Sequence, residues 1–145
     1  MRSLLASWQF WAVGSAMFAA LTAIFAKVGV ENVSADFATF IRTIVILGVV
    51  ALLLAATGGW QAPGAISART YVFLVLSGIA TGASWLCYFR ALKLGEAARV
   101  APIDKLSVVM VAVFGAIFLG ERLSLPNWLG VALIAVGALL VAYKG

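Results

Sequence analysis

Long apolar stretches joined by short polar connections dominate the sequence. Within each stretch the apolar residues run continuously instead of alternating with polar ones, which is typical of lipid-embedded helices and not of membrane strands. About 20 helical residues cross a hydrocarbon core roughly 30 Å thick, so each stretch is long enough to span a bilayer. The pattern predicts five transmembrane helices, at residues 8–26, 37–57, 71–92, 100–120 and 127–143.

The composition supports this interpretation. Hydrophobic residues make up 65% of the 145 residues and charged residues only 10%, which is more apolar material than a soluble core of this size can bury. A segment inside lipid must satisfy its own backbone hydrogen bonds, and helices do so. The connections are too short to fold alone. The sequence therefore predicts an all-α integral membrane protein with a single domain over residues 1–145.

Several function classes lack the residues they need. The net charge of +5 would suit a nucleic-acid partner, but no basic stripe lies outside the predicted spans. The single cysteine, Cys87, lies inside the third span and the sequence has no histidine, so a zinc site and His-based catalysis have no ligands or base. We expect no enzyme activity, no cofactor, no metal and no nucleic acid, with the lipid bilayer as the surroundings.

The odd number of spans places the two termini on opposite sides of the membrane. With Arg42 and Lys105 left out because they lie deeper within spans, three Lys and Arg residues fall on the N-terminal side. Five fall on the C-terminal side, including Arg90 near the end of the third span. The positive-inside rule then places the C-terminus in the cytoplasm. Because the excess is small, it is also compatible with insertion in both orientations.

Charged residues inside two spans are candidates for function. Arg42 lies in the second span, and Asp104 with Lys105 lies at a similar depth in the fourth. A charge in hydrocarbon costs about 3 kcal/mol on insertion scales, so such residues are functional candidates by default. An Arg42–Asp104 pair, joined by Arg90, would grip a charged substrate or bind a proton. Alternatively, the cations extend to the headgroups, and Pro102 with Asp104 marks the first turn of a helix.

Three aromatic residues share one face of the third span: Trp85, Tyr88 and Phe89. An aromatic face can stack a flat or cationic ligand, or it can simply pack against other helices. We expect ligand contact for Trp85 and Tyr88 and packing for Phe89. The candidates for substrate binding or coupling are therefore Arg42, Asp104, Trp85 and Tyr88.

Three stretches in the second half of the chain carry a family resemblance: GEAARVAPIDKLS at residues 95–107, FLGERLS at 118–124, and WLGVALI followed by GALL at 128–134 and 137–140. With the first two spans, they resemble the EamA family of the drug/metabolite transporter superfamily over essentially the whole chain. The resemblance implies one five-helix repeat unit, as in a short branch of the family. Long members carry two inverted units around a central cavity, so it also implies a homodimer of antiparallel copies.

The chain is also similar in outline to the small multidrug resistance family. The last helix of that family dimerises through glycines seven residues apart, as Gly130 and Gly137 are here. The first span of this chain lacks the membrane acid that couples protons in that family. Asp104 is then the remaining candidate for proton coupling.

The resemblance implies a secondary transporter in the plasma (inner) membrane of a prokaryote. Such a homodimer would export a small metabolite or amphipathic compound by alternating access. Two alternatives stay open at this point. One is a non-transporting membrane subunit that packs against a larger partner, and the other is a component of a lipid-linked carrier flippase, which would have a groove open to lipid.

Overall fold

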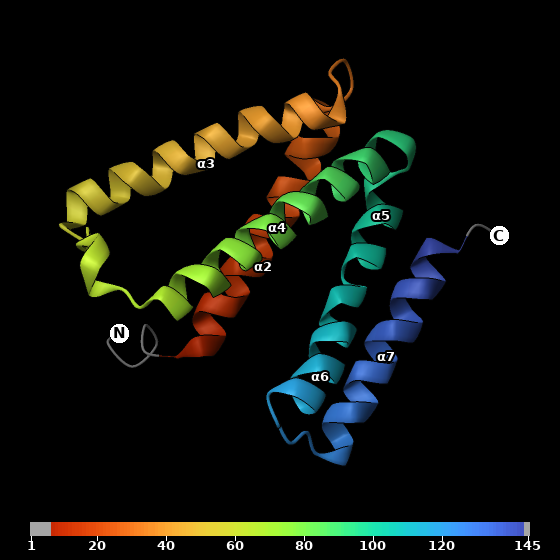
Figure 1. The fold of residues 1–145 in the computed structure, drawn as a ribbon. Helices are drawn as coiled ribbons and strands as arrows, with labels where there is room; N and C mark the ends of the chain where they lie inside the picture. The colour runs from red at the N-terminus through yellow and green to blue at the C-terminus, as the bar shows by residue number, and fades with distance from the viewer. Residues whose placement is uncertain (1–6, 144–145) are drawn as a thin grey trace. The chain divides into compact units, whose positions relative to one another are not determined.

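A computed structural model of the chain describes residues 7–143, and each expected span is helical in it (Figure 1). Five stretches of helix are long and apolar enough to cross a membrane. Every regular element in the described range is a helix, which confirms the all-α prediction. The elements are α2 (Trp8–Gly29), α3 (Ala35–Thr57), a short 3-10 helix η1 (Pro63–Ala65), α4 (Ala68–Leu94), α5 (Ala97–Asp104), α6 (Leu106–Phe118) and α7 (Leu125–Ala142).

The ends of α3 follow from local capping chemistry. Ser34 precedes the helix in extended conformation, and its hydroxyl oxygen accepts a hydrogen bond from the backbone N–H of Phe37 at 3.3 Å. Asp36 in the first turn suits the partial positive charge of the helix N-terminus. At the other end Gly58 takes the left-handed conformation, with φ of 65°, and its N–H donates to the carbonyl of Leu54. The helix therefore begins two residues before the predicted span and ends at the predicted residue.

Two glycines are required by backbone conformation. Gly58 after α3 and Gly120 after α6 have φ of 65° and 69°, which costs other residues about 1 kcal/mol or more. We expect Gly58→Ala and Gly120→Ala each to lower the free energy of unfolding by about 1 kcal/mol. The measurement is unfolding of the purified protein in mixed micelles with increasing sodium dodecyl sulfate. In the control Gly14→Ala, nothing lies within 4 Å of the added Cβ, so stability should be unchanged or raised; an equal loss there would contradict the conformational explanation.

The fourth span is interrupted at Lys105, where α5 ends and α6 begins. Pro102 lies inside α5, and proline has no N–H to donate and crowds the preceding turn. The interpretation of Pro102 as part of a first helical turn is therefore wrong, because the helix already begins at Ala97. The break makes Asp104 the last residue of α5.

The chain forms two compact units. Unit 1 comprises Met1–Ala26 and Leu94–Gly145, and unit 2 comprises Lys27–Lys93. Within unit 1, α7 runs alongside α5 and α6 (Figure 1). That the two units act as one domain stays a prediction.

In unit 2, the start of α3 is fastened to the end of α4. The buried side chains of this unit are Val30, Ala35, Thr39, Phe89 and Leu92. Beside them, the ammonium group of Lys27 donates to the carbonyl of Leu92 at 2.7 Å, and that of Lys93 donates to the carbonyl of Val33 at 2.8 Å. Carbonyls in the last turn of a helix lack partners within the helix, so the Lys27 bond satisfies one of them.

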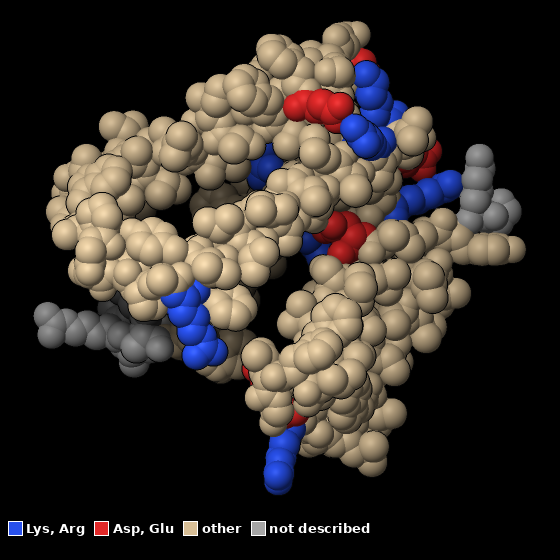
Figure 2. Space-filling model, in the orientation of Figure 1, with Lys and Arg blue, Asp and Glu red and all other residues tan. Residues whose placement is uncertain are grey.

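Large apolar side chains cover most of the helix surface. Phe18 and Leu52 are each 72% exposed, and uncharged residues make up most of the surface visible in Figure 2. In water this exposure would be unfavourable, whereas in a bilayer hydrocarbon surrounds these side chains.

Threonine hydroxyls inside the helices bond to their own helix. Thr22 donates to the carbonyl of Phe18 at 2.8 Å, and Thr39, Thr43, Thr57 and Thr81 make the same bond to the carbonyl four residues earlier. These bonds satisfy a polar group in lipid without a neighbouring helix. Thr22 therefore has a hydrogen-bond partner within its own helix.

Candidate functional site

Unit 2 brings together two of the residues expected to bind substrate. The guanidinium carbon of Arg42, on α3, lies 3.1 Å from the ring centroid of Trp85, on α4. The same carbon lies 5.9 Å from the ring centroid of Phe89. A guanidinium over an aromatic face is attracted by the negative charge of the π-system, and the attraction grows when water is excluded.

Neighbouring rings fix the orientation of Trp85. Tyr88 meets it edge to face, with centroids 5.8 Å apart, and Phe89 is tilted against it at 5.9 Å. Phe89 is only 3% exposed, which confirms that it packs in the interior. We call Arg42, Trp85, Tyr88 and Phe89 together the Arg42 seat.

The Arg42 seat lies inside the helices and not at their ends. Arg42 is seven residues after the first residue of α3, and Trp85 is nine residues before the last residue of α4. At about 1.5 Å per residue these positions are roughly 10 Å and 13 Å from the helix ends. The contact with Trp85 holds the guanidinium at this depth, whereas a free arginine would extend toward the headgroups.

Arg90 pairs with Asp36, a residue that the sequence alone does not single out. Its Nη2 donates to both carboxylate oxygens of Asp36, at 2.9 and 3.1 Å, so Arg90 does not join Arg42. Both side chains are about 60% exposed, and such pairs contribute about 1 kcal/mol or less. Their positions in the sequence could have suggested this pair, because the first turn of α3, with Asp36, and the end of α4, with Arg90, are expected on the same side of the membrane.

Asp104 belongs to unit 1 and has a neighbour in sequence as its ion-pair partner. Its Oδ2 lies 3.1 Å from the ammonium group of Lys105, and the Asp104 side chain is 32% exposed. An Arg42–Asp104 pair stays a prediction, because the two residues belong to different units.

The turn after α6 is built around a glycine. The backbone N–H of Glu121 donates to the carbonyl of Gly115 at 3.1 Å. The Glu121 side chain folds back so that its Oε2 lies 2.6 Å from the position a Cβ on Gly115 would occupy. Gly115 is buried and leaves room for the carboxylate, which anchors the end of α6.

The EamA-like transporter family matches residues 6–143. The chain belongs to this family. A protein of Sinorhizobium sp. named "uncharacterized transporter in cobO 3'region" is 71% identical over 136 residues, covering 94% of this chain and 96% of that protein. A probable 4-amino-4-deoxy-L-arabinose-phosphoundecaprenol flippase subunit ArnE of Hamiltonella defensa is 27% identical over 86 residues, covering 59% of this chain and 76% of that protein. No solved structure matches the chain.

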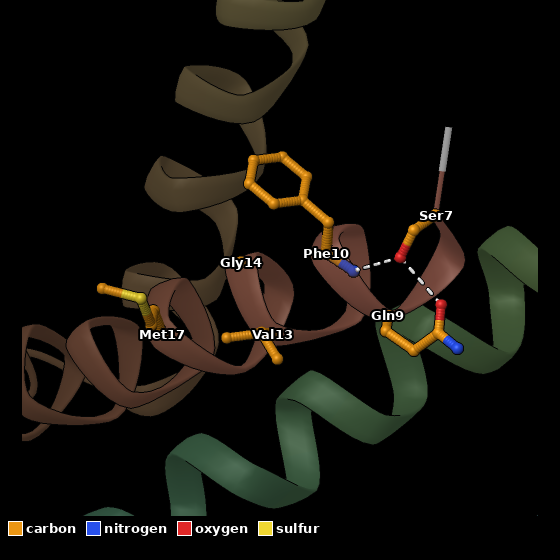
Figure 3. A pocket seen from close by; sticks show the side chains of 6 residues that line it. All are labelled: Ser7, Gln9, Phe10, Val13, Gly14 and Met17. Carbon is orange, nitrogen blue, oxygen red and sulfur yellow. Dashed lines mark hydrogen bonds between the residues drawn. The ribbon is translucent and has the colours of Figure 1, made fainter. Parts of the chain in front are cut away.

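As a member of the EamA family, the chain is a multi-pass membrane protein of a transporter family. A surface hollow lies at the start of α2, and Figure 3 shows it from close by. The hollow is open and apolar, with a volume of about 450 Å³, and is lined by Ser7, Gln9, Phe10, Val13, Gly14 and Met17. Ser7 donates to the amide oxygen of Gln9 at 2.7 Å and accepts from the N–H of Phe10 at 3.4 Å. None of the expected site residues lines it.

Proposed function

We propose that this EamA-family chain is a secondary transporter that exports a small metabolite or amphipathic compound across the inner membrane of a prokaryote. The observation that carries the proposal is the Arg42 seat. A guanidinium held against Trp85, well inside two membrane-crossing helices, is costly to insert, and charged groups at such positions usually mark a substrate or ion pathway.

The proposed active form is a homodimer that contacts through α7. Val131, Ala135 and Ala138 lie on one face of α7 and are buried or half-buried. At about 100° per residue, Gly130 and Gly137 lie about 110° away from that face. No heavy atom lies within 4 Å of a Cβ built on either glycine, so this face is open for the backbone of a second copy to approach closely.

Alternating access would follow from two such protomers. A cavity between them would open first to one side and then to the other as one bundle rocks against its partner. A substrate must bind both states for the cycle to turn over. Antiparallel copies are compatible with the small difference in Lys and Arg between the two sides of the membrane.

The second candidate function is a lipid-linked carrier flippase component. The observation that favours it is the 27% identical relative named as a flippase subunit. A component of this kind would move a lipid carrier and not a soluble metabolite, and a subunit would need a partner chain for activity.

Reconstitution of the purified chain in liposomes distinguishes these functions. We expect the chain alone to move at least one solute from a metabolite panel, because two copies would supply the whole pathway. Trp85→Ala should reduce the rate at least about tenfold, equal to about 1.4 kcal/mol. The control Trp60→Ala, in the connection after α3, should leave the rate unchanged. Movement of a fluorescent polyprenyl phosphate without any solute flux would instead support the flippase component, and a chain inert in both assays would contradict transport.

A further inference from the structure

The donor groups of Arg42 have no acceptor within unit 2. A guanidinium carries five N–H donors and is always charged. Unit 2 is described in full, and its residues give Arg42 the two ring contacts but no hydrogen bond and no ion pair. The carboxylate of Asp36 accepts from Arg90 with both oxygens, and no bond joins it to Arg42 within unit 2.

The geometry favours an anion over a cation as the missing partner. With Cζ 3.1 Å from the ring centroid, the guanidinium already covers one face of Trp85, where a cationic ligand would otherwise stack. A second cation there would also be repelled by Arg42. The guanidinium edge, in contrast, presents paired donors that match a carboxylate or phosphate.

The charges near this end of unit 2 are mainly positive. Lys27, Arg90 and Lys93 lie within the same segment, against the two acids Glu31 and Asp36. The ammonium group of Lys93 donates to the backbone carbonyl of Val33, and no carboxylate takes part in that contact. This excess of positive charge would draw an anion toward the Arg42 seat.

The surroundings of the Arg42 seat also fit an apolar tail. Val45, Ile46 and Val49 follow Arg42 on α3 by three, four and seven residues, so they lie on the same side of the helix as Arg42. All three side chains are exposed. A ligand with an anionic head at Arg42 would therefore lay its tail against an apolar helix surface.

We propose that the Arg42 seat binds the carboxylate or phosphate head of an amphipathic anion. The proposal rests on the proposed transport function and names the class of its substrate. The same head-group chemistry is offered by a free amphipathic solute and by a membrane lipid, so the test separates these two sources.

The test measures binding to the purified chain in phosphatidylcholine nanodiscs. Replacing Trp8, Trp11, Trp60 and Trp128 by phenylalanine leaves Trp85 as the only tryptophan, so its emission reports on the Arg42 seat. The probes share one tail and differ in the head: dodecyl phosphate, dodecanoate, dodecanol and dodecyltrimethylammonium. We expect saturable changes with the two anions and affinities at least about tenfold weaker for the other two, since bonds to charged groups are the stronger ones.

Substitutions of Arg42 test whether the guanidinium is responsible. Arg42→Gln should weaken dodecyl phosphate binding at least about tenfold. Arg42→Lys keeps the charge without the paired donors and should restore part of the affinity, which a merely unfolded variant would not do. The matched control is Arg69→Gln, because Arg69 also lies over a ring, 5.8 Å from the Phe73 centroid, outside the Arg42 seat. Equal affinity for all four heads, or an unchanged affinity in Arg42→Gln, would overturn the proposal.

Phosphatidylglycerol nanodiscs identify the source of the anion. The negative surface of this bilayer repels dodecyl phosphate in every variant, so the parent protein is compared with Arg42→Gln. If a lipid phosphate occupies the Arg42 seat, this lipid should weaken dodecyl phosphate binding at least about tenfold more in the parent protein than in Arg42→Gln. If a free solute is the natural occupant, the loss of affinity should be equal in the two proteins. This assay measures binding and not flux. A chain that binds the anions selectively but moves no solute would therefore contradict the transport proposal and leave the anion site standing. Flux of a neutral solute that is unchanged in Arg42→Gln would contradict the anion site and leave the transport proposal standing.

Discussion

Leucine at both Gly130 and Gly137 is expected to weaken dimer formation and reduce solute flux while leaving the protomer folded. The two glycines lie about 110° around α7 from its buried face, and a Cβ added at either one meets no atom within 4 Å. A leucine there would instead separate the backbones of two copies. We expect dimer affinity to fall at least about tenfold, equal to about 1.4 kcal/mol.

Single-molecule photobleaching of labelled protein in liposomes, at a series of protein-to-lipid ratios, measures this affinity. The matched control is Ala132→Leu, which adds the same bulk to an exposed position on another flank of α7. That control should keep both dimer and flux. A double leucine variant that remains dimeric and active would rule out contact through this face, and one that carries solute as a monomer would refute the dimeric pathway.

Asp104→Asn is expected to remove the dependence of flux on a pH gradient. A carboxylate within a membrane-crossing helix is a candidate for proton coupling, and Asp104 lies where the chain passes from α5 to α6. Breaks of this kind place polar groups inside many transporters. The amide cannot release a proton, so uptake against a concentration gradient should fall at least about tenfold while downhill exchange continues.

A pH-sensitive dye inside liposomes, recorded together with solute uptake, measures this coupling. Asp36→Asn is the isosteric control, because Asp36 pairs with Arg90 at the exposed start of α3. It should retain gradient-driven uptake. Coupling that survives in Asp104→Asn would show that another group carries the proton, and a wild-type chain indifferent to the gradient would exclude proton coupling altogether.

Part of the candidate site follows from the sequence. Trp85, Tyr88 and Phe89 must share a helix face because of their spacing, and Arg42 is a candidate because its charge lies within an apolar span. The pairing of Arg90 with Asp36 does not follow, because Arg90 has several possible partners at the same side of the membrane. Which ring receives the Arg42 guanidinium also depends on how α3 rotates against α4.

The sequence by itself determined the fold class, the five spans and the family. The reason is that lipid imposes a local constraint: each segment must be apolar, long enough to cross, and able to satisfy its own backbone hydrogen bonds. The tertiary structure decided that Arg90 pairs with Asp36 and that the fourth span is interrupted at Lys105. It also showed that the glycine face of α7 is open, because contacts between helices depend on their rotation and register, which hydropathy does not encode.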